Sequence, residues 1–304
     1  MERPQFKIAL LHPRYWLTWL FFLMWFLLVQ LPYPLLCAIA WLLSKLFLVT
    51  ALRRRRIAER NIELCFPEMS AVDRKKLIHD NFYSMAMALP ETGMAWFWPQ
   101  WRLRRLFKIQ GLEHLNNDDE RGVILMAMHF STLDIGGAFL NMCADVDAMY
   151  RPHKNPVYDY VQRRGRERHS SDTQVVTRED VRGMVRRLKQ GRAVWYAPDQ
   201  DYGPKQSVFV PFFGVQAATV TATGKFARLG NARIVPFVQH RLPRCRGYEV
   251  TVYPELDNFP TGEEEADAVR INRFIEQRIL EQPEQYMWVH RRFKTRPPGE
   301  PKLY

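Results

Sequence analysis

The strongest constraint in this sequence is a stretch without any charged residue, residues 15–44, close to the N-terminus. The part before Pro32 already has about the length that a helix needs to cross a bilayer, at roughly 1.5 Å per residue. Trp16 near one end and Tyr33 beyond the other match the preference of amphipathic rings for the boundary between lipid and water. Four tryptophans in the uncharged stretch make a buried core helix the weaker interpretation. We therefore predict a transmembrane or membrane-anchoring helix at residues 14–36.

The flanks of this stretch predict how the chain is divided and oriented. The segment at 35–50 is apolar but contains Lys45, which is typical of a helix that lies against a membrane. An "AIA" sequence resembles a signal-peptidase site, but the preceding apolar run is longer than a usual signal core, so we expect no cleavage. Four arginines at 53–56 form the larger basic flank. The prediction is an N-terminal membrane anchor, residues 1–50, and a cytoplasmic domain, residues 51–304.

The net charge of the chain indicates a negatively charged partner. The formal charge is +12 and the isoelectric point is about 9.7. Nucleic acid, an anionic membrane, a phosphorylated substrate and an acidic protein would all suit this charge. No RNA- or DNA-binding motif is recognisable, and aromatic residues are not interleaved with the basic ones in a stacking pattern, so we expect no nucleic-acid partner.

Beyond residue 50 the hydrophobic pattern alternates between short apolar runs and longer amphipathic segments. The apolar runs predict strands at 122–128, 146–150, 173–176, 192–198, 232–238 and 248–254. The amphipathic segments predict helices at 54–64, 70–95, 131–143, 155–168, 178–190, 216–229 and 263–281. This alternation predicts an α/β fold in which helices flank a sheet.

The first predicted strand ends at a histidine that is followed five positions later by an aspartate. Ligands bind at the carboxyl ends of strands in open α/β sheets, and His129 falls at such an end. With Asp134 in the first turns of the next helix, its carboxylate is expected to fold back and orient the imidazole, which could then act as a general base. A second match to this spacing, at His114, lies in a polar loop and is given no role.

The sequence offers this histidine neither a nucleophile nor a metal. There is no G-x-S-x-G motif, no H-E-x-x-H motif and no C-x-x-C pair, and the cysteines occur singly. The simplest chemistry is therefore direct attack of a bound alcohol on an activated acyl carbon, without a covalent enzyme intermediate.

Further charged residues follow the other predicted strands and the last helix. Arg151 ends the second strand and could bind a phosphate in bidentate fashion, although a surface arginine beside a proline turn is the alternative. Asp199 and Asp201 follow an apolar strand and could hold Arg151 or sugar hydroxyls, with ordinary turn chemistry as the alternative. Arg291 and Arg292 could contact an acidic substrate or partner, or form a solvated basic face.

Several blocks of the chain resemble the late acyltransferases of bacterial lipid A biosynthesis, which belong to the lysophospholipid and glycerolipid acyltransferase superfamily. The similar blocks are "LLHPRYWLTW", "QLPYP", "ERNIELCFPEMS", "ETGMAWFWP", "MHFSTLD", "YRPHKNP", "WYAPDQDYGP" and "PEQYMWVHRRFKTRP". The resemblance implies an acyltransferase-type mixed sheet and transfer of a fatty acyl chain from acyl carrier protein to a hydroxyl of a Kdo-bearing lipid IVA acceptor. It also implies a place at the bacterial inner membrane, His129 as general base, Asp134 as its orienting acid, and no cofactor besides the acyl donor.

Two departures from the family pattern affect these expectations. Relatives of the lauroyl type more often have glutamate where this chain has Asp134, which weakens any inference about acyl chain length. Relatives also tend to carry Arg-Ser-Asn-Lys where this chain has "RERHSSD", residues 166–172, so we expect the local substrate contacts to differ from theirs.

Two other classes of protein compete with this interpretation. A membrane-anchored esterase would use the same histidine and aspartate, but it would need a nucleophile or an activated water that the sequence does not specify. A membrane-tethered protein that binds an anionic polymer would account for the charge alone.

Overall fold

The computed structural model describes residues 4–116 and 120–304. The α-helices are α1 (Trp16–Val29), α2 (Tyr33–Thr50), α3 (Leu52–Cys65), α4 (Ala71–Phe97), α5 (Gln100–Leu103), α6 (Leu133–Asn141), α7 (Pro156–Glu167), α8 (Val181–Lys189), α9 (Ala222–Gly230) and α10 (Glu264–Glu281). Short 3-10 helices are η1 (Ile8–Leu11), η2 (Pro13–Tyr15), η3 (Leu112–Leu115), η4 (Pro204–Gln206) and η5 (Pro283–Gln285).

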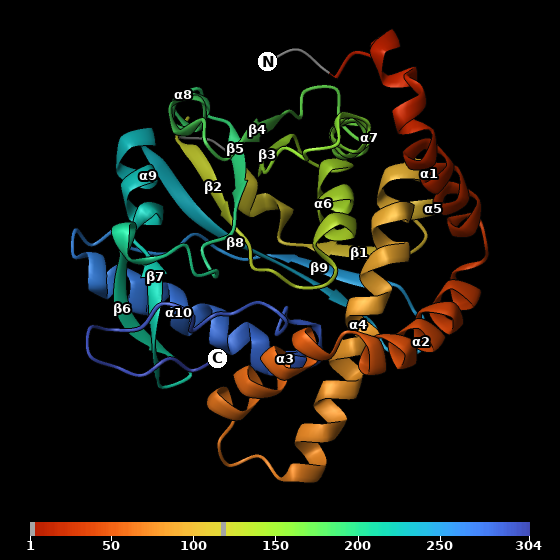
Figure 1. The fold of residues 1–304 in the computed structure, drawn as a ribbon. Helices are drawn as coiled ribbons and strands as arrows, with labels where there is room; N and C mark the ends of the chain where they lie inside the picture. Colours follow the sequence, from red (N-terminus) through yellow and green to blue (C-terminus); the bar gives the residue numbers. More distant parts are fainter. Residues whose placement is uncertain (1–3, 117–119) are drawn as a thin grey trace.

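The sheet at the centre of the molecule is mixed (Figure 1). Its strands are β1 (Phe107–Gln110), β2 (Gly122–Met126), β3 (Val146–Tyr150), β4 (Val175–Thr177), β5 (Ala193–Tyr196), β8 (Ala232–Arg241) and β9 (Tyr248–Val252). Their order is β1-β9-β8-β2-β5-β3-β4, and only β8 and β9 run antiparallel. The predicted mixed α/β fold is therefore confirmed. Every residue of β2 is buried, as expected for a parallel strand covered on both faces.

One predicted helix is partly wrong. The segment predicted as a helix at 216–229 begins as strand β7 (Val215–Val220), which pairs with β6 (Ser207–Phe212), and only its second half forms α9. The two strands are joined at Phe213 and Gly214, whose φ angles of 49° and 75° provide the left-handed turn that a tight hairpin needs. Tertiary pairing thus overrides the helical pattern. Strand β1 was also not predicted, because its four residues alternate between half-buried and exposed and none is fully buried.

The segment predicted as one membrane helix at residues 14–36 forms α1 and the first turn of α2 in the structure, and its contact with the membrane as an anchor stays a prediction. Helix α1 ends at Val29, and α2 begins at Tyr33 after Pro32, which has an extended ψ of 143°. Proline disfavours helical backbone at the residue before it and has no N–H for the helical ladder, so the "QLPYP" segment separates two helices. At about 1.5 Å per residue, α1 spans only about 21 Å, less than the roughly 30 Å of a bilayer core.

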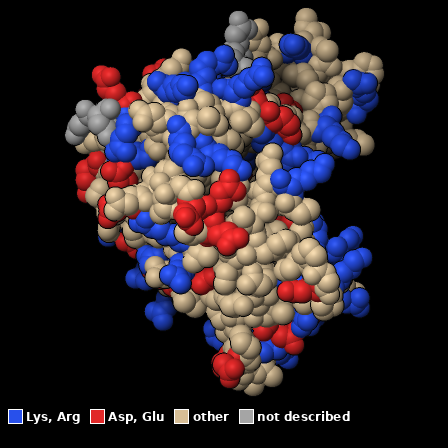
Figure 2. Space-filling view, turned by 90° about the vertical axis from the view of Figure 1, so that its left-hand side faces the viewer, with Lys and Arg blue, Asp and Glu red and all other residues tan. Residues whose placement is uncertain are grey.

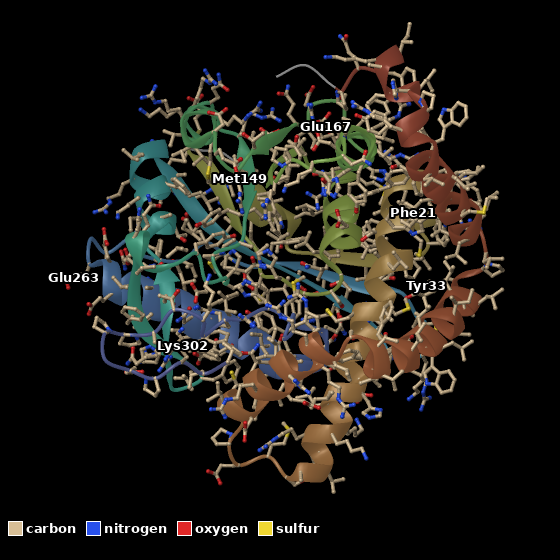
Figure 3. The ribbon with its side chains drawn as sticks, viewed as in Figure 1. Phe21, Tyr33, Met149, Glu167, Glu263 and Lys302 are labelled. Carbon is tan, nitrogen blue, oxygen red and sulfur yellow. The ribbon has the colours of Figure 1, made fainter. Side chains whose placement is uncertain are left out.

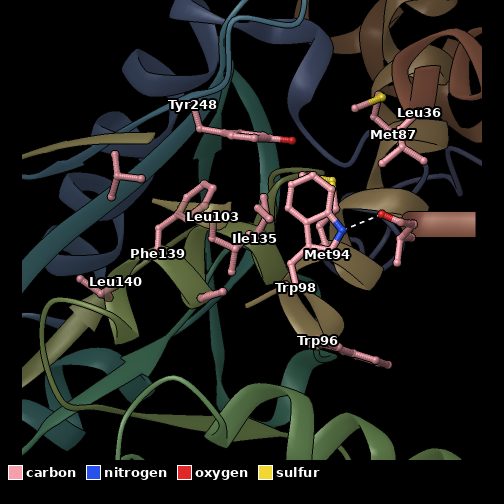
Figure 4. Packing of buried hydrophobic residues seen from close by; sticks show 14 of the residues in the cluster. Leu36, Met87, Met94, Trp96, Trp98, Leu103, Ile135, Phe139, Leu140 and Tyr248 are labelled. Carbon is pink, nitrogen blue, oxygen red and sulfur yellow. Dashed lines mark hydrogen bonds between the residues drawn. The ribbon is translucent and has the colours of Figure 1, made fainter. Parts of the chain in front are cut away.

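Helix α1 packs tightly against α4. The indole of Trp98 donates to the carbonyl of Val29 at 2.6 Å, which is the dashed bond in Figure 4, and the indole of Trp25 donates to Leu89 at 3.2 Å. At Gly93 of α4, a Cβ atom would lie 2.6 Å from the Val29 side chain, so the two helices approach closely because this position is glycine. The N-terminal helices and the sheet share one hydrophobic core. Residues on both sides of the predicted boundary near residue 50 contribute to this core, and the division into an anchor and a cytoplasmic domain stays a prediction.

The other side of α1 and α2 is an apolar surface. Phe21 of α1, labelled in Figure 3, is 47% exposed. Large exposed apolar side chains on the two helices are Trp16, Leu17, Leu20, Phe21, Leu23, Met24, Phe26, Leu27, Leu35, Trp41, Leu42, Leu46 and Val49. Among the described helices, α2 is long and apolar enough to cross a membrane, but a third of it is buried in the protein. This surface suits lipid contact, and whether α2 spans the membrane stays a prediction.

The unusual "RERHSSD" segment closes the end of α4. The guanidinium of Arg168 donates to the carbonyl of Trp96 at 2.7 Å, and Nε2 of His169 lies 2.7 Å from the carbonyl of Ala95. Burial lowers the pKa of His169 to about 4. These contacts give the segment a structural role in holding α4 against the C-terminal end of α7.

We predict that His169 makes the fold less stable in acid. Because its folded pKa lies below the unfolded value of about 6.5, its stabilising contribution is complete above pH ~6.5 and is lost as the pH falls toward 4. The free energy of unfolding should fall by up to about 3 kcal/mol over this pH range. His169→Gln keeps a donor for Ala95 but cannot titrate, so urea denaturation at pH 7 and 4.5 should show a smaller acid loss for this variant. Equal acid losses in the two proteins would contradict the prediction.

Candidate active site

The turn between β2 and α6 places His129 at the edge of a large cleft. The strand ends at Met126 and α6 begins at Leu133, so His129 lies in the connection at the carboxyl end of a central strand. Its side chain is 17% exposed. It lines a cleft of about 870 Å³ that also contacts β3, β5, the loop after β5 and the N-terminal ends of α6 and α8. The imidazole and the ring of Trp195 lie nearly perpendicular, at 84°, with 6.2 Å between the ring centroids.

The carboxylate that holds the imidazole belongs to Asp199. Its Oδ1 lies 2.6 Å from Nδ1 of His129, and its Oδ2 accepts the backbone N–H of His129 at 2.8 Å. Burial by itself would raise the pKa of Asp199, but the charge of His129 and these hydrogen bonds outweigh it and hold the pKa below its ordinary value. With the carboxylate ionised, Nδ1 carries the proton and Nε2 is left as the basic nitrogen.

The predicted pairing of His129 with Asp134 is therefore wrong. Asp134 lies in the first turn of α6 and lines the same cleft, but its Oδ1 accepts a hydrogen bond from Nε of Arg166 at 2.8 Å. Arg166 is in the last turn of α7, which packs beside α6. Asp134 reaches this neighbouring helix, whereas Asp199 lies in the loop that follows β5, the strand paired with β2. A role for Asp134 in catalysis stays a prediction.

The strand register explains the pairing that the structure shows. Met126 of β2 pairs with Tyr196 of β5 in parallel. His129 lies three residues beyond Met126, and Asp199 lies three residues beyond Tyr196. His129 and Asp199 are therefore 70 positions apart in the sequence, as the two paired strand residues are. Parallel neighbours end at the same edge of a sheet, so the two side chains meet there. We predicted that Asp199 lies at this edge, but not that it is the partner of His129.

Arg151 lies where it was predicted, whereas Asp201 does not reach the cleft. Arg151 follows β3, is exposed and lines the cleft together with His129. Asp201 is buried and accepts hydrogen bonds from the backbone N–H and hydroxyl of Thr295, at 2.6 and 2.8 Å. The turn chemistry that was the alternative for Asp201 is present too, since its Oδ1 accepts the N–H of Gly203 at 2.9 Å. Asp201 thus fastens the C-terminal segment.

The prediction that Arg292 binds substrate is wrong, because its side chain lies inside the protein. It is 2% exposed and donates to the carbonyl of Ala218 at 2.7 Å and to the hydroxyl of Thr219 at 2.9 Å. Arg291 is half buried, its guanidinium lies 5.7 Å from the ring centroid of Tyr304, and it is not among the residues that line the cleft. These arginines attach the C-terminal segment to the hairpin and the chain end.

The segment that follows η5 lies against the histidine turn. The N–H of Met287 donates to the carbonyl of His129 at 3.0 Å, and Phe130 and Tyr286 form an antiparallel bridge. The N–H of Ser131 donates to the carbonyl of Gln285 at 2.8 Å. The backbone on both sides of the imidazole is therefore held by main-chain hydrogen bonds, which fixes the position of His129.

Two asparagines on the N-terminal helices hold this segment from its other side. The side-chain amide of Asn81 in α4 donates to the carbonyls of Glu284 and Tyr286, at 2.9 and 2.8 Å. The amide of Asn61 in α3 donates to Trp288 and His290, at 2.6 and 2.7 Å. Both asparagines are buried. The "ERNIELCFP" and "PEQYMWVH" blocks are thus in direct contact.

A buried ion pair joins the same region to the sheet. Arg241 at the end of β8 donates to both carboxylate oxygens of Glu91 in α4, at 2.5 and 2.7 Å, and to the hydroxyl of Ser131 at 3.2 Å. Tyr248 donates to Glu91 at 2.8 Å. Burial alone would lower the pKa of Arg241, but the charge of Glu91 and its hydrogen bonds raise it. Burial raises the pKa of the Glu91 carboxyl, against the opposing effect of Arg241 and Tyr248, so the guanidinium is the partner whose charge is firmly held.

These supporting residues were not predicted from the sequence. Glu91, Asn81 and Arg241 are single polar residues within apolar or amphipathic elements, and such residues are usually solvent-exposed. One feature of the sequence could have indicated that Glu91 is buried. It lies among apolar residues in a long predicted helix, in the block "ETGMAWFWP" that resembles the family.

The walls of the cleft combine apolar and basic side chains. Apolar contacts come from Met85, Leu133, Met149, Trp195 and Phe226, and positive charge from Arg151, Arg166, Arg178 and Lys205. A smaller apolar pocket lies behind Asp134 and Arg166 and shares Leu133, Met149 and Trp195 with the cleft. The described residues contain no group of three or more His, Cys, Asp or Glu side chains placed to bind a metal. The site can thus supply a base to an amphiphilic, anionic substrate.

Comparison with known proteins indicates a family. Residues 3–295 match the family model of the bacterial lipid A biosynthesis acyltransferases. The chain is 47% identical to the lipid A biosynthesis lauroyltransferase of Escherichia coli K12 and 46% identical to its palmitoleoyltransferase, in each case over 99% of both proteins. It is 40% identical to a lipid A biosynthesis acyltransferase of Haemophilus influenzae, over 99% of this chain and 98% of that protein.

A solved structure shows a more distant likeness. The crystal structure of a 1-acyl-sn-glycerophosphate acyltransferase from Thermotoga maritima aligns with 77% of this chain and 97% of its own, at 14% identity and a TM-score of 0.39. A likeness this weak carries no argument about the site.

We predict that Glu91 and Arg241 stabilise the fold only as a pair. Glu91→Gln leaves the guanidinium buried without its counter-charge, and Arg241→Met leaves the carboxylate buried alone, so each change should cost about 3–5 kcal/mol. The double variant should lose clearly less free energy of unfolding than the two single variants lose together, because no unpaired charge remains in it. The free energy of unfolding in urea, measured for all four proteins, checks this. Additive losses would contradict it.

Proposed function

The chain belongs to the bacterial lipid A biosynthesis acyltransferase family, and from this premise we propose that it transfers a fatty acyl chain from acyl carrier protein to a hydroxyacyl hydroxyl of Kdo-bearing lipid IVA. The observation that carries the proposal is the imidazole of His129, fixed by Asp199 at the edge of a cleft with apolar and basic walls. Such a cleft suits an acceptor that has both acyl chains and phosphates.

The proposed reaction uses a single proton carrier. Nε2 of His129 takes the proton of the acceptor hydroxyl while the oxygen attacks the thioester carbonyl carbon. Asp199 holds Nδ1–H and stabilises the imidazolium that forms. When the tetrahedral intermediate collapses, the carbon–sulfur bond breaks and the thiolate takes the proton from His129. The products are the new ester and the free carrier thiol, and His129 returns to its neutral state.

The proposed acceptor accounts for the basic side of the cleft. Arg151 and Arg178 stand at the cleft near the ends of β3 and β4, and each guanidinium could bind a phosphate of the acceptor. Asp134 holds Arg166 at the boundary between the cleft and the smaller apolar pocket. In this arrangement the charged part of the substrate faces the arginines and the acyl part faces the apolar walls.

The proposed location is the bacterial inner membrane, with the cleft on the cytoplasmic side. The exposed apolar side chains of α1 and α2 support contact with lipid, and the arginines at 53–56 support this orientation by the positive-inside rule. An acceptor with acyl chains would then reach the protein from the bilayer, and the acyl carrier protein from the cytoplasm.

The overall reaction can be tested by product mass. Purified protein is incubated with a mixture of acyl carrier protein thioesters and with lipid IVA, with and without its Kdo sugars. We expect one added acyl chain on the Kdo-bearing lipid, and its mass gives the chain length. Release of the acyl chain only as free fatty acid would instead support the membrane-anchored esterase.

We predict that His129 and Asp199 contribute more to the rate than Asp134. His129→Ala should reduce turnover by about 10²–10⁴-fold. Asp199→Asn should also cost roughly 10²–10⁴-fold, because an amide favours the wrong imidazole tautomer. Asp134→Asn should cost less, since its carboxylate contacts Arg166 and not the imidazole. A larger loss for Asp134→Asn than for Asp199→Asn would show that Asp134 orients the base during turnover.

We predict that Arg151 binds the acceptor through its planar guanidinium. Arg151→Lys should raise the KM for the lipid acceptor and change the KM for the acyl donor little, because an ammonium group cannot make a bidentate contact to phosphate. Arg273→Lys on α10, an exposed position outside the cleft, is the matched control. Steady-state kinetics with each substrate varied in turn measure the effect. An unchanged acceptor KM in Arg151→Lys would exclude this role.

A further inference from the structure

Helix α8 presents a stripe of basic side chains to solvent. Arg182, Arg186 and Lys189 are exposed and follow one another at helical spacing, over about 10 Å of the helix axis. Within the described residues, none of these three side chains makes a hydrogen bond or an ion pair. In Figure 2, Lys and Arg side chains gather over the upper part of the face that includes this helix. The stripe is thus available to a partner.

Other arginines of this region serve the fold and are not part of the stripe. Arg187 donates to Asp147 at 2.8 Å, and Arg192 donates to the same buried carboxylate at 2.6 and 2.9 Å. The basic residues of this region therefore fall into two sets. The inner set, Arg187 and Arg192, is neutralised by Asp147, and the outer set is the stripe, which has no acidic partner among the described residues. Only the outer set leaves its charge uncompensated.

An apolar groove lies beside the stripe, between α8 and α9. Val181, Val185 and Leu229 form its floor, and the three basic residues of the stripe line it as well. Leu229 is 58% exposed and Val181 is 42% exposed, so the groove presents apolar surface to solvent. An apolar centre with a charged rim is the usual anatomy of a protein–protein interface.

The two helices that form this groove are held rigidly. A Cβ atom at Gly230 would lie 2.6 Å from the Leu188 side chain, and one at Gly122 would lie 2.3 Å from the Leu188 carbonyl, so α8 is pressed against both α9 and β2. The groove is therefore preformed, which reduces the entropic cost of binding.

The groove is continuous with the cleft that contains His129. Val181 lines both of them, and Arg178 and Glu179, just before α8, line the cleft. Helices α8 and α9 lie on the opposite side of the sheet from α1 and α2 (Figure 1). A lipid surface that covers the apolar face of α1 and α2 would therefore leave the groove free for a protein in solution.

We propose that the groove between α8 and α9 is the docking surface for the acidic carrier protein that delivers the acyl thioester. The inference rests on the proposed function and adds the place of contact. Acidic side chains on a helix of the carrier pair with the stripe, and an apolar side chain of that helix covers Val185 and Leu229. The prosthetic arm, attached next to this contact, then enters the cleft past Val181 and brings the thioester carbon to His129.

The experiment compares two donors in matched charge-reversal variants. The first variant carries Arg182→Glu, Arg186→Glu and Lys189→Glu. The control carries Lys75→Glu, Lys108→Glu and Arg273→Glu, three exposed positions outside the cleft and the groove, with the same change in net charge. Each full-length protein is assayed with acyl carrier protein thioester and with the same acyl group on pantetheine, which lacks the carrier protein. Leu229→Glu is a further variant whose exposed position leaves the fold unaffected.

The α8 variant and Leu229→Glu should each raise the KM for the carrier-protein thioester by roughly tenfold or more, because steering and rim pairing are lost. Turnover of acyl pantetheine should be unchanged in both, and the control should match wild type with both donors. Three results would overturn the docking surface. The α8 variant could match the control in its KM for both donors, or its activity could fall equally with both donors. It could also keep wild-type kinetics with both donors and lose only its binding to anionic vesicles. Failure of wild type to use the carrier-protein thioester would instead overturn the proposed function.

Discussion

The parallel pairing of β2 with β5 is the constraint on which the rest of the site depends. The register of the two strands, continued beyond their ends, sets His129 beside Asp199. Both strands lie inside the sheet, between β8 and β3, so neither can shift without disrupting its other neighbour. A slip of one residue would also turn the buried side chains of β2 to the opposite face. The core thus holds the catalytic geometry in place.

Support for the turn after β2 comes from parts of the chain that are far apart in sequence. Asn61 and Asn81 hold the backbone of the C-terminal segment, and this segment holds the backbone on both sides of His129. The Glu91–Arg241 pair adds a contact to Ser131. Burying this pair gains little net stability compared with apolar side chains, but its bidentate geometry permits few alternative arrangements. We therefore interpret the network as a device that positions the turn.

The fold class, the order of most elements and the position of His129 were predictable because they depend on local patterns. Apolar runs and helical periodicity located β2, β3, β8, β9 and most helices within a few residues. The errors share one cause. The partner of His129, the burial of Arg292 and the β6–β7 hairpin are decided by which strands and segments become neighbours, which no local spacing records. Asp134 was chosen because it is near in sequence, whereas Asp199 is near in space.

The break at Pro32 has a consequence for how lipid could reach the site. Two shorter helices joined by a proline turn can each keep one face on α4 and turn the other outward, which a single straight helix across a bilayer could not do. The outward faces of α1 and α2 carry the exposed apolar side chains, and the basic groove of α8 and α9 lies on the far side of the sheet. If the proposed function holds, a lipid acceptor and an acidic donor protein approach from different directions and need not compete for one surface. The cleft containing His129 contacts the start of α8 and the middle of α4, so it lies between the two approaches, where an acceptor hydroxyl and a donor thioester would have to meet.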